Sequence, residues 1–257
     1  MIDINQDVAS RFPPLGGGGA AMILAAGLGT RLKPWTDHHP KALAIVNNKS
    51  LLQRNVEYLQ QFGIKDVVVN VHHFADQVKQ AVENNNGWGS NILISDEKDE
   101  VLETGGGLVK AASLLNPAES FVLMNVDILT DLDLAAMISY HNNNHPLATL
   151  ATTNRETSRY FLFDEDDNLR GWRNVKTGEQ KGNVEGAKHL MQKAFSGIHI
   201  INPNIFKLIK HQGKFSMVDV YLNLMNDHTI KSFDHSSSKF IDVGKPESIS
   251  TAAKLFQ

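Results

Sequence analysis

Short apolar segments alternate with segments of helical periodicity along much of this chain, and the alternation limits the folds it can adopt. Residues 21–25 and the β-branched run 67–71 have the length and composition of buried strands. Apolar residues recur at helical spacing over 51–62 and 74–82. Strands are also expected at 92–94 and 121–124, and a helix at 108–115. Strands joined through helices predict an α/β fold with a doubly wound, mostly parallel, Rossmann-like sheet.

The pattern changes near residue 147. Short strands are expected at 147–152, 160–163 and 169–172, around an acidic turn at 164–168. Closely spaced strands joined by a turn favour antiparallel pairing, so we expect a small antiparallel elaboration of the sheet over about 147–193. The remaining segments predict strands at 194–201, 230–233 and 240–243 and helices at 203–210 and 217–226.

Residues 1–19 differ in composition from the rest of the chain. A polar stretch is followed by Phe12-Pro13-Pro14-Leu15 and then by four consecutive glycines, which is typical of a flexible linker. We interpret this segment as a flexible leader, either non-native or a natural extension. The other residues, 20–257, are enough for one domain with a substantial core, and we expect a single domain there.

Composition excludes several kinds of partner. The formal net charge of −3 gives no general attraction to nucleic acid or to an anionic membrane, so any phosphate binding must be local. The longest apolar run, 20–26, is far below the roughly 20 residues that span a bilayer, and no signal peptide precedes it. The chain has no cysteine, which excludes disulfides and thiolate metal sites. These features predict a cytoplasmic protein without a membrane or nucleic-acid partner.

The strand at 21–25 runs directly into a glycine loop. Gly27 and Gly29 expose backbone N–H groups at the end of that strand, which suits the oxygens of a phosphate. A dinucleotide-binding fingerprint needs a small residue where Leu32 stands and a helix that continues past it, which Pro34 interrupts. A P-loop needs Gly-Lys followed by Ser or Thr, and this segment has none.

Residues 27–41 follow the pattern Gly-x-Gly-Thr-Arg-Leu-x-Pro-x-Thr-x-x-x-Pro-Lys, which resembles the signature of sugar-phosphate nucleotidyltransferases, or NDP-sugar pyrophosphorylases. The resemblance implies a glycosyltransferase-A-like fold. It implies that Arg31 and Lys41 hold the triphosphate tail and neutralise charge on the leaving pyrophosphate. The nucleotide would contact Leu24, Ala25, Ala26, Gly27, Gly29 and Thr30.

Two aspartates stand in contexts similar to the metal-binding motifs of the same family. Asp127 follows the strand at 121–124 in Asn125-Val126-Asp127, which resembles Asn-Gly-Asp with Val126 in place of the glycine. Asp242 precedes Val243-Gly244 and resembles the aspartate of Trp-x-Asp-x-Gly. Because Mg²⁺ prefers oxygen ligands and often takes one or two carboxylates, the resemblance implies that Asp127 and Asp242 hold Mg²⁺.

The resemblance also assigns the base and sugar contacts. Residues 102–107 precede a predicted helix and resemble the family's second glycine-rich turn, so Glu103, Thr104 and Gly105 would approach the nucleobase, and Gln77 could bond its edge. Asn125, Ser196 and Gly197 would line the sugar pocket. Longer members carry Glu-Lys-Pro, whose lysine meets the sugar phosphate. This chain has no such tripeptide in the corresponding stretch, so Arg173 is our candidate cation, with Lys176 and Lys193 as alternatives.

The short chain, the Glu-Thr-Gly-Gly-Gly turn and the Phe-Ser-Gly-Ile strand resemble small N-acetylmuramate 1-phosphate uridylyltransferases and their mannose- or heptose-phosphate guanylyltransferase relatives. The implied reaction joins a nucleoside triphosphate (UTP first, GTP second) to a sugar 1-phosphate and releases pyrophosphate. The attack is in line on the α-phosphorus and needs no general base and no covalent nucleophile. A monomer or homodimer is expected, because long allosteric tails are absent.

Three other interpretations stay open. A phosphocholine cytidylyltransferase shares the glycine loop and would differ in its acceptor pocket. A catalytically silent paralogue would bind a nucleotide sugar without turning it over, which the four charged residues Arg31, Lys41, Asp127 and Asp242 disfavour. A Rossmann-type oxidoreductase is disfavoured because an acidic residue is missing near Asn47.

Overall fold

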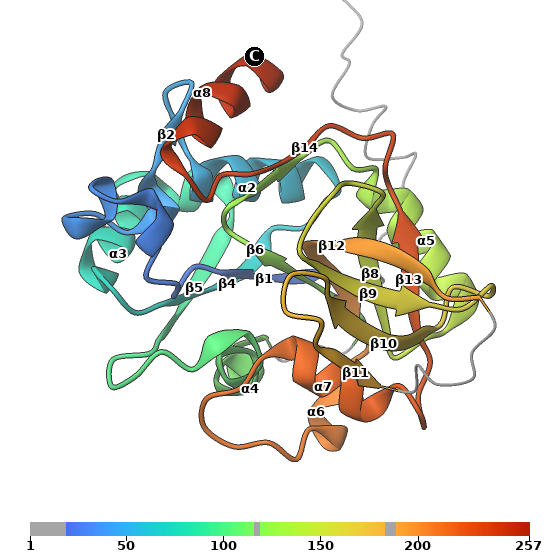
Figure 1. Cartoon of the computed structure of the whole chain (residues 1–257). Helices are drawn as coiled ribbons and strands as arrows, with labels where there is room; N and C mark the ends of the chain where they lie inside the picture. Colours follow the sequence, from blue (N-terminus) through green and yellow to red (C-terminus); the bar gives the residue numbers. More distant parts are fainter. Residues whose placement is uncertain (1–18, 116–118, 183–188) are drawn as a thin grey trace, which may run out of the picture.

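The structure, a computed structural model, describes residues 19–115, 119–182 and 189–257. The predicted leader, 1–19, therefore lies almost wholly outside the described residues. Within them, ten strands form one sheet, and helices cover both of its faces (Figure 1). The sheet is mixed, with a parallel core, and this confirms the predicted fold class.

Four neighbouring strands make the parallel core. Their order is β5 (Asn91–Asp96), β4 (Asp66–Val71), β1 (Ala20–Leu24) and β6 (Phe121–Asn125). In this register Leu24, the last residue of β1, lies beside Asn70 of β4 and Asn125 of β6. Since parallel strands end at the same edge, the segments that follow them meet on one side of the sheet.

The other half of the sheet is mainly antiparallel and begins at β12 (Met191–Ile201). This long strand pairs antiparallel with β6 of the core, so it joins the two halves. Its register against β8 shifts between Phe195 and His199, which makes a bulge there. The other strands of this half are β8 (Ala148–Thr153), β9 (Arg159–Phe163), β10 (Leu169–Asn174), β11 (Gln180–Gly182) and β13 (Ile230–Asp234), which runs parallel to β8.

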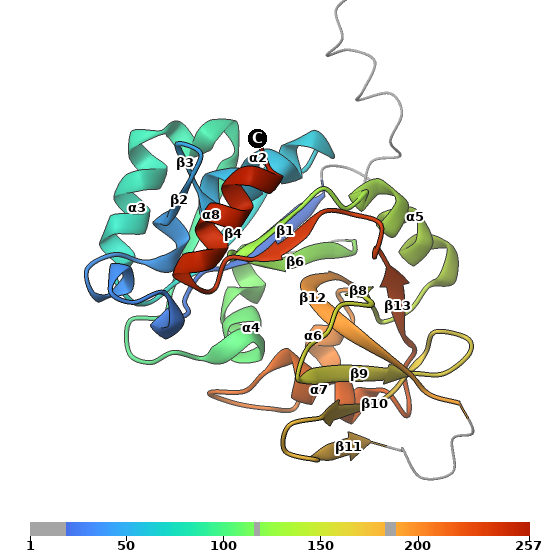
Figure 2. The same cartoon turned by 45° about the horizontal axis from the view of Figure 1, so that its top comes forward.

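The helices divide between the two faces of the sheet, as Figure 2 shows. One face is covered by α2 (Leu51–Gln61), α3 (Ala75–Asn84), α5 (Leu134–Asn144) and α8 (Pro246–Leu255). The other is covered by α4 (Glu103–Leu115), α6 (Ile205–Leu208) and α7 (Met217–Leu224). The sequence did not predict α5 or α8, and α6 is shorter than the helix expected at 203–210. Among the described helices, none has both the length and the apolar character needed to cross a membrane.

Short elements complete the chain. The loop after β1 contains three 3-10 turns, η1 (Thr30–Leu32), η2 (Trp35–Asp37) and η3 (Lys41–Leu43), and η4 (Asn86–Gly89) follows α3. A hairpin of β2 (Ile45–Val46) and β3 (Lys49–Ser50) leads into α2. Finally, β7 (Ile128–Thr130) pairs antiparallel with β14 (Phe240–Asp242), so the last strand joins the loop after β6 and not the main sheet.

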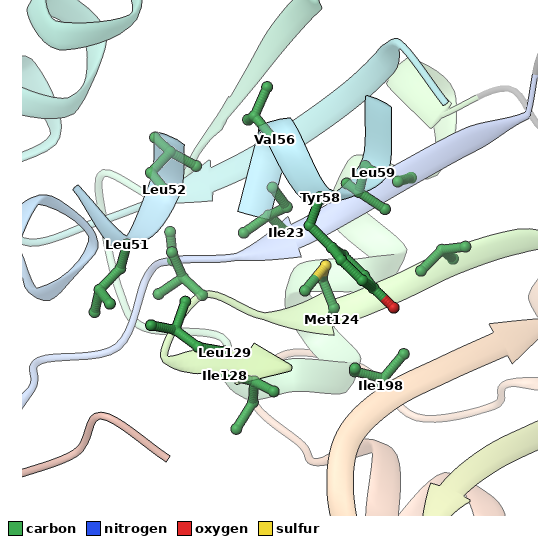
Figure 3. Close-up of a cluster of buried hydrophobic side chains, with 14 of the residues drawn as sticks. Ile23, Leu51, Leu52, Val56, Tyr58, Leu59, Met124, Ile128, Leu129 and Ile198 are labelled. Atoms are coloured by element: carbon green, nitrogen blue, oxygen red, sulfur yellow. The ribbon is translucent and has the colours of Figure 1, made fainter. Parts of the chain in front are cut away.

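Helix α2 shows how sequence produces the core. It begins after Ser50, whose hydroxyl accepts a hydrogen bond from the Gln53 N–H at 3.1 Å. One stripe of α2 packs against Ile23 of β1 and Met124 of β6 (Figure 3). Full burial of each large apolar side chain stabilises the fold by about 1.5–3 kcal/mol. The buried apolar residues of α2 are Leu51, Leu52, Val56, Tyr58 and Leu59.

Candidate active site

A cavity of about 350 Å³ opens at the carboxyl ends of β1, β4 and β6. This is the edge where ligands collect in open α/β sheets. Most of its lining is apolar or backbone, with a lysine and two acidic side chains among the polar groups. The lining residues are Leu24, Ala25, Ala26, Gly27, Lys41, Asn70, Val101, Glu103, Thr104, Asn125, Val126, Asp127 and Ser216.

A chain of buried hydrogen bonds shapes the floor of this cavity. The Ala25 N–H donates to Asn70 Oδ1 at 2.7 Å, and Asn70 Nδ2 donates to Glu97 Oε1 at 2.6 Å. The other Glu97 oxygen accepts from the Leu102 N–H at 2.9 Å, just before α4. This series of hydrogen bonds therefore links the end of β1 to the residue just before α4. The sequence pattern gave no role to Asn70, although a polar residue near the end of a buried β-branched strand is a usable signal.

The segment predicted as a glycine-rich turn before a helix is instead the first turn of α4. A Cβ on Gly105 would lie 2.5 Å from the Phe215 ring, and one on Gly107 would lie 2.7 Å from Glu97 Oε1. These glycines are therefore required for close packing of α4 against its neighbours. Thr104 and Glu103 line the cavity, and the Thr104 hydroxyl accepts from the Met217 N–H at 2.8 Å. Gly105 does not line it.

The glycine loop folds tightly on itself. Gly29 has a φ of 61°, and a Cβ there would lie 2.9 Å from Thr36 Cγ2, so glycine is required. The Thr36 hydroxyl donates to the Gly29 carbonyl at 2.9 Å. Thr30 lies in η1 and is exposed, outside the cavity lining. Gln77 also lies outside the cavity lining. Its amide donates to the His38 carbonyl at 2.9 Å and holds this loop.

The four charged residues come together beside the cavity. Lys41 Nζ contacts Asp127 Oδ2, and both side chains are largely buried, at 11% and 17% exposed. Arg31 Nη2 lies 3.5 Å from Asp242 Oδ2, and both of these side chains are more open to solvent. The Val243 N–H donates to the Asp127 carbonyl at 2.8 Å, which ties the end of β14 to the loop after β6.

The carboxylates of Asp127 and Asp242 are suitable ligands for a divalent cation. Burial and the nearby Asp127 carboxylate raise the pKa of Asp242, although Lys41 and Arg31 oppose the rise. Asp242 Oδ1 is buried and has no hydrogen-bond partner among the described residues. Two carboxylates that repel one another, one with an unpaired oxygen, match the hard oxygen ligands of Mg²⁺. The described residues hold no cluster of three or more histidine or acidic side chains, so phosphates and water would complete the coordination.

Gly244 explains why a glycine follows this second aspartate. A Cβ at position 244 would lie 2.5 Å from Arg31 Nη2 and 2.7 Å from Asp242 Oδ1. The contact between Arg31 and Asp242 therefore needs glycine here. The sequence motif contained this residue, but its role depends on a neighbour that is distant in the chain.

The residues expected around the sugar lie at the bulge of β12. Gly197 has a φ of 75°, and a Cβ there would lie 2.8 Å from Asn125 Nδ2. Asn125 lines the cavity, whereas Ser196 and Gly197 do not. The Ser196 hydroxyl is 1% exposed and lies 2.8 Å from His235 Nε2, so it is engaged within the protein.

None of the three predicted sugar-phosphate cations lines the cavity. The Arg173 guanidinium on β10 lies 3.0 and 3.1 Å from the Gln180 carboxamide oxygen on β11, with that amide in its favourable orientation. Lys193 Nζ bonds Asp167 and the Ser232 hydroxyl, at 2.5 and 3.0 Å. Lys176 is exposed in the turn between β10 and β11. The assignment of Arg173 to the sugar phosphate therefore stays a prediction, and its guanidinium lies against Gln180 of the neighbouring strand.

A comparison with protein-family models matches residues 20–257 to the family described as nucleotidyl transferase. The chain belongs to the nucleotidyl transferase family. The match begins where β1 begins, so it includes the glycine loop, both aspartates and α8.

Relatives of this nucleotidyl transferase differ in length. It is 30% identical over 230 residues to N-acetylmuramate alpha-1-phosphate uridylyltransferase of Neisseria meningitidis, covering 87% of this chain and 92% of the relative. It is 27% identical over 247 residues to mannose-1-phosphate guanylyltransferase catalytic subunit beta of Drosophila pseudoobscura, covering 94% and 63%. A UTP–glucose-1-phosphate uridylyltransferase of Synechocystis is 28% identical, covering 88% and 60%. The chain spans about three fifths of the length of these last two relatives.

Solved structures share the fold of this nucleotidyl transferase. HddC from Yersinia pseudotuberculosis, complexed with GMP-PN, matches with a TM-score of 0.72 and 25% identity, covering 93% of this chain and all of that one. A UDP-glucose pyrophosphorylase complexed with UDP-glucose matches with a TM-score of 0.74 at 17% identity, covering 93% and 98%. The second likeness concerns the fold alone, and it agrees with the mixed sheet described above.

Proposed function

We propose that this chain transfers a nucleotidyl group from a nucleoside triphosphate to a sugar 1-phosphate, giving an NDP-sugar and pyrophosphate. The observation that carries the proposal is the contact of Lys41 with Asp127 beside the glycine-loop cavity, with Asp242 and Arg31 next to them. The family match supports it, as do relatives named for uridylyl and guanylyl transfer to sugar phosphates.

The chemistry needs positioning and charge neutralisation. An oxygen of the sugar phosphate attacks the α-phosphorus, and a new phosphorus–oxygen bond forms. The bond from the α-phosphorus to the oxygen that bridges to the β-phosphorus breaks, and its electron pair leaves with pyrophosphate. Because the attacking phosphate is already an anion, the proposal assigns no general base and no covalent nucleophile.

Each charged side chain has a proposed role in this reaction. Backbone N–H groups at Ala26 and Gly27 receive phosphate oxygens at the mouth of the loop, because the Ala25 N–H is bonded to Asn70 Oδ1. Lys41 and Arg31 hold the triphosphate tail, and Arg31 is free to turn because its side chain is 58% exposed. Asp127 and Asp242 would hold Mg²⁺, which when bound neutralises phosphate charge.

The proposal names UTP as the first donor and GTP as the second. The uridylyltransferase of Neisseria meningitidis, aligned over nearly its whole length, supports UTP, and the guanylyltransferase relative supports GTP. Glu103 and Thr104 remain the proposed base contacts, because both line the cavity. A cytoplasmic monomer or homodimer remains part of the proposal.

The test is pyrophosphate release with Mg²⁺. Four nucleoside triphosphates are screened against the 1-phosphates of N-acetylmuramate, glucose, N-acetylglucosamine, mannose and heptose, with phosphocholine as a further acceptor. Release with one sugar pair, lost in Asp127→Ala, is the expected result. Release with CTP and phosphocholine alone would show that the acceptor is phosphocholine and not a sugar 1-phosphate. Silence with intact nucleotide binding by calorimetry would favour a regulatory paralogue, and silence without binding would refute the proposal.

A further inference from the structure

Arg155 lies in the loop between β8 and β9, in the antiparallel half of the molecule. One guanidinium nitrogen, Nη2, donates to the Phe195 carbonyl at 2.8 Å. The guanidinium also lies over the Phe240 ring, with Cζ 5.1 Å from the ring centroid. No other hydrogen bond or ion pair joins it to the described residues, and Arg155 is exposed. It is therefore held in one orientation while most of its N–H donors remain open to a ligand.

The position of Phe240 places Arg155 beside the aspartate site. Phe240 and Asp242 are two residues apart on β14, so their side chains leave the strand on the same face. An arginine that lies over Phe240 therefore lies on the Asp242 side of β14. The pKa values agree: partial desolvation lowers the pKa of Arg155, while Asp242 and then Tyr160 raise it. The guanidinium stays protonated at every physiological pH.

The anchor of Arg155 is the segment expected to line the sugar pocket. The Phe195 carbonyl stands at the start of the β12 bulge, two residues before Gly197, which packs against Asn125. Two buried polar atoms of this region have no partner among the described residues: Thr153 Oγ1 and His235 Nδ1. The His235 ring contacts Phe240, at 5.8 Å between centroids. Unpaired buried polar atoms are typical of a place that water or a ligand completes.

The acceptor of this reaction needs such a cation. Two anions, the triphosphate and the sugar phosphate, must approach each other closely, and they repel at that distance. A guanidinium offers two parallel donors to a phosphate, so it both reduces the repulsion and orients the oxygens. Lys193 is committed to Asp167 and Ser232, and Arg173 faces Gln180, so neither is open in this way.

We propose that Arg155 binds the phosphate of the acceptor and directs one of its oxygens toward the α-phosphorus. This inference rests on the proposed function, because it assigns the acceptor's phosphate to a residue of the same site. This proposal assigns to Arg155 the role for which Arg173 was the candidate in the sequence.

The experiment compares Arg155→Ala and Arg155→Lys with Arg159→Ala, an exposed arginine on β9, as the matched control. For each full-length protein, kinetics are measured at saturating nucleotide with varied sugar 1-phosphate, and nucleotide affinity is measured alone by calorimetry. We expect Arg155→Ala to lower kcat/KM for the acceptor roughly 10- to 100-fold, in line with loss of a charge-assisted pair. Arg155→Lys should recover part of the loss, and nucleotide affinity should be unchanged in both.

Rescue of Arg155→Ala by free guanidinium distinguishes the loss of a phosphate contact from a structural effect of the substitution. Millimolar guanidinium chloride should restore acceptor turnover by Arg155→Ala and leave Arg159→Ala unaffected, with sodium chloride as the ionic-strength control. Equal loss of nucleotide affinity and acceptor kinetics, without rescue, would overturn the inference. So would a normal acceptor KM in the Arg155 variants together with a raised one in Arg173→Gln. A wild-type protein inactive with every pair would refute the proposed function itself, whereas an active one with unaffected Arg155 variants refutes this inference alone.

Discussion

The two halves of the sheet build their parts of the site in different ways. In the parallel half, β1, β4 and β6 end at one edge, so residues that follow them meet there by topology. On the antiparallel side, polar groups come from a bulge in β12, a loop after β8 and the short β14, which pairs with β7 outside the main sheet. A strand end is visible in a sequence, whereas a bulge and a loop conformation are not. The nucleotide side is therefore the more predictable side of this protein.

The largest effect is expected from the parallel half. Lys41→Ala removes the cation in contact with Asp127 and leaves two carboxylates without it. We expect kcat/KM to fall roughly 10²- to 10³-fold, as when a preorganised electrostatic group is lost at other active sites. Steady-state pyrophosphate release measures this, with Lys49→Ala, which removes a partly buried ion pair with Glu57 away from the cavity, as control. If Lys41→Ala lowered kcat/KM less than Arg155→Ala does, the antiparallel half would contribute more to the reaction than the parallel half.

Gly244→Ala tests the point where the halves meet. The added Cβ must displace Arg31 or Asp242, because it would lie 2.5 and 2.7 Å from their polar atoms. We expect a loss of roughly 10- to 100-fold in kcat, since small misplacements of reacting groups carry penalties of this size. The melting temperature should change little, because the clash involves partly exposed side chains. Lys245→Ala is the neighbouring control, and equal activity in the two variants would show that the contact is dispensable.

Acid should weaken the antiparallel half first. Burial lowers the pKa of His141 and of His235 to about 4 and that of His199 to about 3, and each bonds a partner in or against this half. The unfolded chain binds these protons near pH 6.5 and the folded chain does not. Stability is therefore complete above pH 6.5 and falls as pH drops toward 4, by up to about 3 kcal/mol per histidine.

Hydrogen exchange between pH 7 and pH 4.5 measures this effect by region. Amides of β8 and β12 should lose protection before those of β1 and β4. Simultaneous loss in all four strands would show that the halves unfold as one unit at acid pH.

The smallest effect concerns the aspartate pair without metal. Because burial and Asp127 raise the pKa of Asp242, its ionised form destabilises the metal-free fold above that pKa. Asp242→Asn should therefore raise the melting temperature in a chelator, by about 2–4 °C for each kcal/mol relieved. The same variant should lose the stabilisation that Mg²⁺ gives the wild type. Thermal unfolding with and without Mg²⁺ checks both, and a lower melting temperature in chelator would contradict the repulsion.

The predicted site residues also differ between the two halves in where the structure places them. The resemblance to the family signature predicted Lys41, and a strand end together with the same resemblance predicted Asp127; both residues line the cavity. Arg173 was predicted from its place in a stretch of sequence, but its strand directs the guanidinium toward Gln180. No pattern in the sequence pointed to Arg155, because its position depends on the β12 bulge and the Phe240 ring.

The features that the sequence did not predict depend on tertiary contacts. Asn70 and Glu97 form a buried bridge whose partners come from three separate segments, so no short window of sequence contains it. The glycines of α4 were assigned to a turn because they resemble the family's second glycine-rich turn, yet close packing against Phe215 and Glu97 requires them inside a helix. Tertiary packing decided these positions against local preference.

The pairing of Arg31 with Asp242 has a consequence for how the protein is made. These residues are 211 positions apart, and the second lies on the last strand. At ribosomal rates of about 5–20 residues per second, roughly 10 to 40 s separate the synthesis of the glycine loop from that of its carboxylate partner. A nascent chain therefore contains the glycine loop, proposed to bind phosphate, long before it contains both aspartates, and the proposed site is complete only after β14 has been synthesised.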